Sequence, residues 1–231
     1  MQKNIMALIT LMRNRLNNTV TSYEEKMLFF HEKGITLSVS DKDLYFLKAD
    51  PRGHVTDMSK VADNLIFRGA EVACFHGTPI QEMSLEESTN GNFLWNQNTI
   101  FIQKLEGHTI YLYWDMKKES WECSNDSKPT SPLKDLVVSQ IYNLMSLDPR
   151  YTYELCFVQG GLDSGIFLVG MYDNKKCFEL EWKKTDAFAF RHNLKRPPIF
   201  AFDGLEKIEE SDLPIIAQDQ TTTKIYITKL K

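Results

Sequence analysis

Cysteine is scarce in this chain, and the four cysteines are far apart. Cys74, Cys123, Cys156 and Cys177 form no CxxC pair, and the five histidines are scattered over the 231 residues. A structural zinc site needs closely spaced cysteine and histidine ligands, so this pattern argues against one. Each cysteine lies in an apolar or strand-like stretch, which predicts reduced core thiols in an intracellular, cytoplasmic protein.

Long apolar runs are also lacking. No stretch approaches the roughly 18 apolar residues that a membrane-spanning helix needs. The apolar part of residues 1–18 is short, and Arg13 and Arg15 follow it without a small-residue cleavage site. We therefore expect neither a signal peptide nor a membrane partner.

An excess of positive charge is absent as well. The formal net charge is −4, so the chain is not predicted to hold nucleic acid by its overall charge. Short basic clusters with aromatic neighbours occur at residues 116–121, 174–176, 183–184 and 195–198. They could follow a phosphate backbone, although such clusters are more often solvated loops.

The composition that remains is that of an ordinary globular protein, with 42% hydrophobic and 25% charged residues. Apolar spacing predicts a first helix over residues 4–17. Ser22 and Glu25 have the spacing of a capping box for a second helix, which Gly34 can end.

Short strand candidates, divided by turn residues, follow these two helices. They cover residues 35–40, 44–49, 64–67, 71–77, 99–105, 109–115, 151–158, 165–173, 177–182 and 224–231. Two more helices are predicted at residues 132–147 and 184–194. This order indicates an α+β fold of antiparallel sheets flanked by helices. We expect a helical segment over residues 1–34 and a body over residues 35–231, which could together form one continuous domain.

The stretch TIFIQKLEGHTIYLYW, residues 99–114, places Lys104 in an otherwise apolar strand, just before a Glu-Gly pair. Lys104 is either a side chain that extends into solvent from a strand end, or a nucleophilic amine at the floor of a nucleotide pocket. Only about one free lysine in a thousand is neutral near pH 7. A nucleophile therefore needs burial and nearby cations, both of which disfavour the ammonium form. A strand that is at least half buried would provide the burial.

The same stretch resembles the first motif of the covalent nucleotidyltransferases, and most closely that of the phage- and virus-type RNA ligases. Their pattern is Lys-x-Asp-Gly, an apolar strand, a turn, and then Trp with a Ser/Thr-rich strand. Two further stretches follow in the family's order. YTYELCFV (151–158) resembles its Phe-Glu-Leu strand, and GIFLVGMYDNKKCFELEW (165–182) with LKRPPIFAFDGLEKI (194–208) resembles its next strand and Arg-Pro segment. The similarity covers about residues 64–210 and suggests a divergent or degenerate member.

This resemblance implies an ATP-grasp-like ligase catalytic domain, that is, a nucleotidyltransferase. In the family, the motif lysine attacks the α-phosphate of ATP, forms lysyl-AMP and releases pyrophosphate, which makes Lys104 the expected catalytic residue. Glu106 stands where the family has Asp, and its extra methylene moves the carboxylate by about a bond length, which can lower the rate. Gly107 either lets the backbone turn close to the nucleotide or is an ordinary turn glycine.

Two further motif residues carry expected nucleotide contacts. Glu154 matches the acid of the Phe-Glu-Leu strand, which the family uses around the ribose and the metal-bound phosphates, and Tyr153 replaces the Phe. The alternative for Glu154 is an outward-facing residue of a half-exposed strand. Phe167 lies where an aromatic ring could stack on adenine, and its alternative is a core phenylalanine.

The tail keeps only part of the family's pattern, which ends with a Glu-Gly strand that binds metal and a Lys-x-Lys strand that contacts phosphates. Lys229 and Lys231 have the Lys-x-Lys spacing, and the alternative is that they belong to a solvated chain end. No Glu-Gly pair precedes them, and Asp219 is the only carboxylate in IIAQDQTTTKIYI. The family's arginine after the first motif is missing, since Asn125 stands near that place. No role is transferred to Arg68.

Together these features predict an ATP-dependent RNA ligase-like nucleotidyltransferase that passes AMP from Lys104 to a 5′-phosphate RNA end for sealing. ATP and Mg²⁺ are the expected cofactors, with Glu154 and Asp219 as metal contacts. A second function stays open, a degenerate domain that binds nucleotide, RNA or a protein partner without turnover. Related possibilities are guanylyl transfer, AMP transfer to a protein, and a partner-docking role for the first 34 residues.

Overall fold

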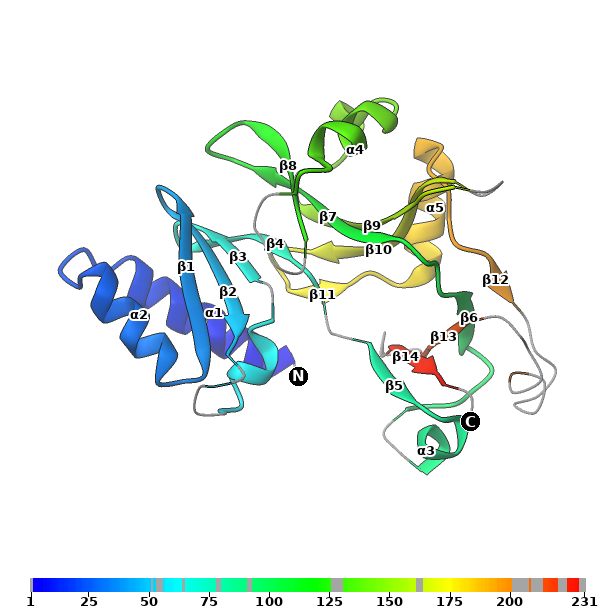
Figure 1. Ribbon diagram of the computed structural model, residues 1–231, viewed down its shortest axis with the longest axis horizontal. Coiled ribbons are helices and arrows are strands. Elements are labelled where there is room, and N and C mark those ends of the chain that lie inside the picture. The colour runs from blue at the N-terminus through cyan, green and yellow to red at the C-terminus, as the bar shows by residue number, and fades with distance from the viewer. Residues whose placement is uncertain are drawn as a thin grey trace. The chain divides into compact units, whose positions relative to one another are not determined.

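The structure is a computed structural model, whose elements are drawn in Figure 1. It describes residues 2–50, 52, 56–63, 65–77, 80–90, 93–125, 131–160, 164–200, 208, 214–219 and 224–228. The chain divides into two compact units. Unit 1 comprises Met1–Gly77, Thr109–Leu155 and Gly170–Glu179, and unit 2 comprises Thr78–His108, Cys156–Val169 and Leu180–Lys231.

Unit 1 begins with two helices, α1 (Gln2–Leu16) and α2 (Tyr23–His31), which lie beside a four-stranded antiparallel sheet (Figure 1). The order of this sheet is β1-β2-β3-β4. Its strands are β1 (Ile35–Asp41), β2 (Leu44–Ala49), β3 (Leu65–Arg68) and β4 (Glu71–Phe75). A short 3-10 helix, η1 (Ser59–Val61), lies between β2 and β3 in the chain.

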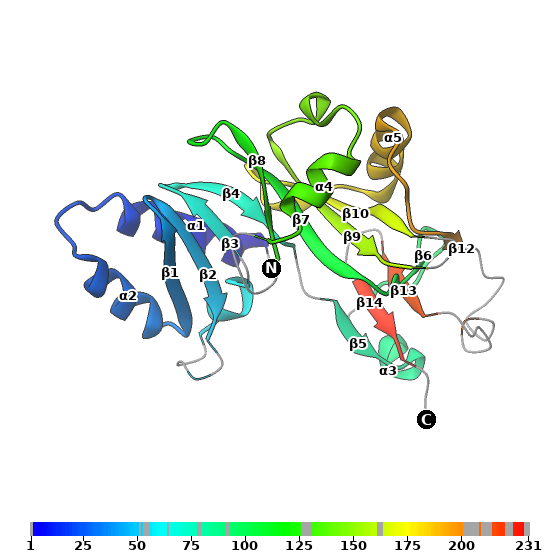
Figure 2. The same cartoon turned by 45° about the horizontal axis from the view of Figure 1, so that its top comes forward.

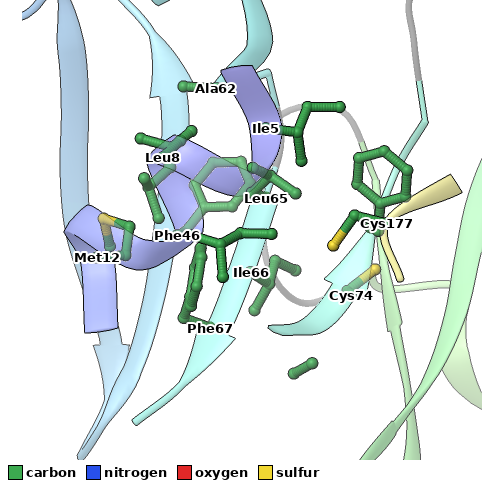
Figure 3. Packing of buried hydrophobic residues seen from close by; sticks show 14 of the residues in the cluster. Ile5, Leu8, Met12, Phe46, Ala62, Leu65, Ile66, Phe67, Cys74 and Cys177 are labelled. Carbon is green, nitrogen blue, oxygen red and sulfur yellow. The ribbon is translucent and has the colours of Figure 1, made fainter. Parts of the chain in front are cut away.

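The apolar stripe of α1 explains why the helix packs on this sheet. Ile5, Leu8 and Met12 recur at helical spacing and are buried. In Figure 3 they gather around side chains of β2 and β3, among them Phe46 and Leu65. The helices and the strands of unit 1 thus share one hydrophobic core, whereas the predicted boundary at residue 34 stays a prediction.

The start of α2 confirms the predicted capping box. The Oγ atom of Ser22 accepts a hydrogen bond from the Glu25 N–H at 3.2 Å, and Glu25 Oε2 accepts one from the Ser22 N–H at 2.9 Å. The helix ends at His31, and Gly34 follows with a left-handed φ of 72° that leads into β1.

A second sheet has the order β11-β10-β9-β7-β8. Its strands are β7 (His108–Asp115), β8 (Ser120–Ser124), β9 (Tyr151–Val158), β10 (Gly165–Asp173) and β11 (Phe178–Glu179). β7 and β8 form an antiparallel hairpin, and β9 and β10 have the predicted bounds. The helix α4 (Lys134–Gln140) and the 3-10 helix η2 (Leu144–Ser146) follow β8 in the chain. The division into units passes through β9 and β10.

Unit 2 contains a third sheet with the order β12-β6-β13-β14-β5. Its strands are β5 (Gln81–Met83), β6 (Ile100–Gln103), β12 (Ile199–Phe200), β13 (Ile215–Gln218) and β14 (Lys224–Ile227). The pairs are antiparallel except β14 with β5, which is parallel. The helices of this unit are α3 (Leu85–Asn90) and α5 (Trp182–His192). Figure 2 shows α3 next to β5 and β14.

The two faces of this third sheet carry different side chains, because successive residues of a strand point to opposite faces. One face packs into a core with the α3 residue Leu85, and its members from the sheet include Phe101 and Ile215. The other face carries a small apolar cluster of Ile100, Ile102 and Ile216, with Ile80, Trp182 and Tyr226 packed against it.

Some predicted elements were wrong in length. The helix predicted over residues 132–147 is only seven residues long, because the backbone is already extended at Ile141, with φ −88° and ψ 103°. The strand predicted over residues 177–182 is reduced to two residues, and α5 already begins at Trp182. The strand predicted over residues 99–105 ends at Gln103. β5, α3 and β13 were not predicted.

The observed architecture confirms an α+β fold of mostly antiparallel sheets flanked by helices. All four cysteines are buried, as the sequence predicts for core thiols. Within the described residues, no helix has the length and the apolar character needed to cross a membrane.

Candidate functional site

Lys104 follows directly on the last residue of β6. Its backbone N–H donates a hydrogen bond to the Pro214 carbonyl at 2.8 Å, which holds this point of the chain against the segment that enters β13. Because Lys104 is two residues beyond Ile102, the strand period places both side chains on the same face of the sheet. The Lys104 side chain is partly buried, as expected for the end of a half-buried strand.

Tyr226 lies beneath the ammonium group of Lys104. Ile216 is paired with Ile102 on β6 and with Tyr226 on β14, so these three side chains lie in one row across the sheet. The Nζ atom of Lys104 is 3.7 Å from the centroid of the Tyr226 ring. This distance is well inside the roughly 6 Å limit of a cation–π contact.

Tyr226 was not among the predicted site residues, and the sequence KIYI shows only on which face of its strand it lies. Lys224 and Tyr226 alternate with Ile225 and Ile227, which belong to the core on the opposite face. Lys224 and Tyr226 therefore lie on the same face of β14, opposite this core. The predicted phosphate-binding residues Lys229 and Lys231 lie outside the described residues.

Glu106 and Gly107 lie in the short connection between β6 and β7. Glu106 is exposed. A Cβ atom at Gly107 would lie 2.4 Å from the Phe157 carbonyl oxygen and 2.8 Å from the Cys156 sulfur. Gly107 is therefore required because the chain passes directly against β9, and not because of a left-handed turn.

Phe167 is a packed residue of β10 and is only 7% exposed. Its backbone forms a parallel bridge with Lys195, whose Nζ atom lies 5.5 Å from the ring centroid. This burial fits the core alternative for Phe167. Stacking of its ring on adenine stays a prediction.

Glu154 is buried in β9, so the alternative of an outward-facing residue is wrong. The hydroxyl of Tyr172, on β10, donates a hydrogen bond to Glu154 Oε2. Gly170 leaves room for this contact, since a Cβ there would lie 3.0 Å from Glu154 Oε2 and 3.2 Å from Glu179 Oε1. Burial, followed by the negative charges of Glu154 and Glu179, raises the pKa of Tyr172 well above 10, so its phenol remains a donor.

His76 is a second buried polar group of unit 1, and one that the sequence analysis did not single out. Its ring stacks on Tyr111 with the centroids 3.9 Å apart, and its Nε2 atom is 2.8 Å from Ser124 Oγ. Its Nδ1 atom is the buried side-chain nitrogen without a hydrogen-bond partner among the described residues. Burial lowers the pKa of His76 to about 3, so the imidazole is neutral near pH 7.

Cations of the basic clusters at residues 116–121 and 195–198 have structural partners. Lys117 forms an ion pair with Asp43 at 3.2 Å. Arg196 donates from Nε to Asp186 at 2.6 Å and from Nη1 to the Val169 carbonyl at 2.8 Å, which ties α5 to β10. These contacts favour the structural interpretation for these two cations, and contact of the clusters with nucleic acid stays a prediction.

Asp219 lies buried at the end of β13, and its Oδ2 atom accepts a hydrogen bond from the Leu94 N–H at 3.3 Å. The residues that the structure describes contain no group of three or more His, Cys, Asp and Glu side chains able to hold a metal ion. Mg²⁺ is commonly bound through one or two carboxylates together with substrate phosphates. Contact of Glu154 and Asp219 with a metal ion stays a prediction.

A groove of about 420 Å³ lies along α2 and β1 in unit 1. It is lined by Glu24, Met27, Leu28, His31, Ile35, Thr36, Leu37 and Asp50. No predicted site residue belongs to this lining. Lys104 belongs to unit 2 and Glu154 to unit 1. The predicted roles of Lys104, Glu154, Lys229 and Lys231 require one shared nucleotide site, and this shared site stays a prediction.

Comparison with known proteins gives a match at the level of structure alone. No protein-family model matches the sequence, and no curated protein matches it. Two solved forms of an archaeal ATP-dependent RNA ligase align over 96% of this chain, with TM-scores of 0.67 and 0.66 and identities of 10% and 12%. A putative ATP-dependent DNA ligase from Aquifex aeolicus aligns over 90%, with a TM-score of 0.66 and 11% identity.

The aligned part spans 64% of each archaeal ligase chain and 62% of the Aquifex aeolicus chain. None of these three structures is described as a phage or virus protein, so the likeness gives no support to the phage- and virus-type subgroup, and at these identities it shows the fold alone. The chain has the fold of the ATP-dependent RNA and DNA ligases.

Proposed function

We propose that this chain is an ATP-dependent, RNA ligase-like nucleotidyltransferase in which Lys104 becomes adenylylated. The observation that carries the proposal is the position of Lys104, a partly buried cation at the end of an inner strand in a fold of the ligase type. Gly107, three residues later, packs against β9 and fixes the path of the loop that follows the amine.

The reaction has three steps. The lone pair of Lys104 Nζ forms a P–N bond with the α-phosphorus of ATP, the bond from this phosphorus to the bridging oxygen breaks, and pyrophosphate leaves with the electron pair. The amine proton passes to solvent. An oxygen of an RNA 5′-phosphate then attacks the same phosphorus and restores the lysine amine. Attack of a 3′-hydroxyl on the activated end seals the RNA and releases AMP.

The other predicted residues have supporting roles in this proposal. Glu154 would contact the ribose or the metal-bound phosphates, Phe167 the adenine, and Lys229 and Lys231 the phosphates. Mg²⁺, when bound, offsets the charge of the triphosphate, and Glu154 and Asp219 are the carboxylates proposed to hold it.

A second candidate function is favoured by three departures from the family's pattern. Glu106 replaces the Asp of the first motif, no Glu-Gly pair precedes the tail, and the family's arginine after the first motif is missing, with Asn125 near that place. These features fit a ligase-fold protein that binds a nucleotide, RNA or a protein partner without turnover.

Incubation with ATP or GTP labelled at the α-phosphate, with Mg²⁺ and followed by a denaturing gel, separates the two candidates. The wild type should retain label from ATP, and Lys104→Ala should lose it because the nucleophile is gone. Lys184→Ala is the matched control, since the Lys184 side chain is 64% exposed and forms an ion pair with Glu181 at 3.7 Å. Absence of label from both nucleotides in the folded wild type would favour binding without turnover.

A further inference from the structure

The ring of Tyr226 is held rigidly by its place in the third sheet of the fold. Its strand β14 lies between β13 and β5, with Tyr226 opposite Ile216 on one side and beside Glu82 on the other. The side chain packs against the apolar cluster of Ile100, Ile102 and Ile216. A ring fixed in this way presents one face to whatever lies above it, and Lys104 Nζ occupies that position at 3.7 Å.

An aromatic face attracts an ammonium ion electrostatically and does not attract a neutral amine in the same way. The contact therefore holds the Lys104 ammonium group on the ring. The usual strength of such contacts corresponds to roughly 3- to 30-fold in favour of a cation on the ring over the same cation in solvent.

We propose that Tyr226 is a positioning residue that keeps the Lys104 ammonium on its ring and releases it to the polyphosphate chain of a nucleotide. This inference rests on the proposed role of Lys104 as nucleophile. Phosphate oxygens carry formal charge and form charge-assisted hydrogen bonds, which are stronger than contact with a neutral ring. Nucleoside triphosphates are therefore the substrates that draw the lysine away, whereas nucleosides leave it on the ring.

Competitive acetylation with acetic anhydride tests this contact without any nucleotide, because only the neutral amine reacts. Acetylation of Lys104 is measured by peptide mass spectrometry and compared with that of Lys184. We expect Tyr226→Leu to raise the relative reactivity of Lys104 by roughly 3- to 30-fold. Tyr226→Phe keeps the ring and should retain the protection. Unchanged reactivity in Tyr226→Leu, or an equal rise in Tyr226→Phe, would overturn the inference.

A second series of variants tests the contact without a change in the shape of the side chain that could disturb folding. Fluorinated phenylalanines incorporated at residue 226 keep the shape of the ring while they withdraw charge from its face. Reactivity of Lys104 should then rise with the number of fluorines, and a flat series would contradict the cation–π contact. ATP should change the acetylation of Lys104 in the wild type, whereas adenosine should leave it as it is. Equal effects of the two ligands would argue against release by polyphosphate.

The two proposals fail in different ways. If the wild type takes no label from ATP while Tyr226→Leu exposes Lys104 to acetylation, the proposed function fails and the ring contact stands. If ATP labels Lys104 while the acetylation of Lys104 is the same in all variants, the nucleophile stands and the role of Tyr226 is refuted.

Discussion

Arg68 and Asp115 form a bidentate ion pair in the interior of unit 1. Arg68 Nε donates to Asp115 Oδ1 at 2.9 Å, and its Nη2 donates to Oδ2. Both side chains are buried, and the Lys117 N–H also donates to Asp115 at 3.0 Å. Burial acts to raise the pKa of Asp115, but the hydrogen bonds from Arg68 and the backbone outweigh it, so the pKa is lowered. The pair joins the ends of β3 and β7, which makes the role of Arg68 structural.

Removing the arginine alone should be costly, because it leaves a buried carboxylate without its cation. We expect Arg68→Met to lower the free energy of unfolding by about 3–5 kcal/mol, measured by urea denaturation. The double variant Arg68→Met with Asp115→Leu is the control, and it should recover a large part of the loss because no charge is left buried. If the free energy of unfolding of Arg68→Met lies within about 1 kcal/mol of that of the wild type, the ion pair does not have the importance for stability that we expect.

His76 should make the protein sensitive to acid. Its pKa is lowered to about 3 by burial, while an unfolded histidine has its ordinary value near 6.5. Between these values the unfolded chain binds a proton that the folded chain does not bind, so stability falls as the pH is lowered. The expected slope from this residue is roughly 1.4 kcal/mol per pH unit.

Urea unfolding at a series of pH values checks this expectation. His76→Gln removes the titrating group, so its stability should fall less steeply below pH 6 than that of the wild type. The comparison uses the slope and not the absolute stability, since the variant also changes the contacts with Ser124 and Tyr111. Parallel slopes in the two proteins would show that His76 does not titrate in this way.

Gly107→Ala should be more damaging than an ordinary glycine substitution. The added methyl group would meet the Phe157 carbonyl at 2.4 Å, so the loop after Lys104 has to shift. We expect a loss of about 1–3 kcal/mol in stability. Since displacement by about 1 Å can cost up to a hundredfold in rate, the labelling of Lys104 should slow as well.

Gly69→Ala is the matched control for this change. Gly69 has a left-handed φ of +58° but nothing within 4 Å of its ideal Cβ position. It should lose only about 1 kcal/mol from backbone strain and keep the rate of labelling. Equal effects of the two substitutions on labelling would contradict a specific role for the close contact between Gly107 and β9.

Elements with strong local signals could be predicted from the sequence. The capping box of Ser22 and Glu25, the apolar stripe of α1 and the strands β9 and β10 all appear where the pattern places them. The apolar run before Lys104 predicts β6, although this strand ends at Gln103, just before Lys104 and not after it.

Other features depend on partners that are distant in the sequence. β5 and β13 are short strands whose pairing with β14 and β6 supplies what their own residues do not signal. Tyr226 is an unremarkable residue of KIYI until the register of β6, β13 and β14 brings it under Lys104. The close approach of Gly107 to β9 likewise depends on tertiary packing.

The most direct test of the account is to locate the covalent nucleotide. The wild-type protein is incubated with ATP and Mg²⁺, digested, and analysed by tandem mass spectrometry for a peptide that carries AMP. The account predicts a single modified peptide with the adenylyl group on Lys104, lost after addition of pyrophosphate, which reverses the transfer. An adenylyl group on any other residue, or an unmodified Lys104 in folded protein saturated with ATP, would contradict it.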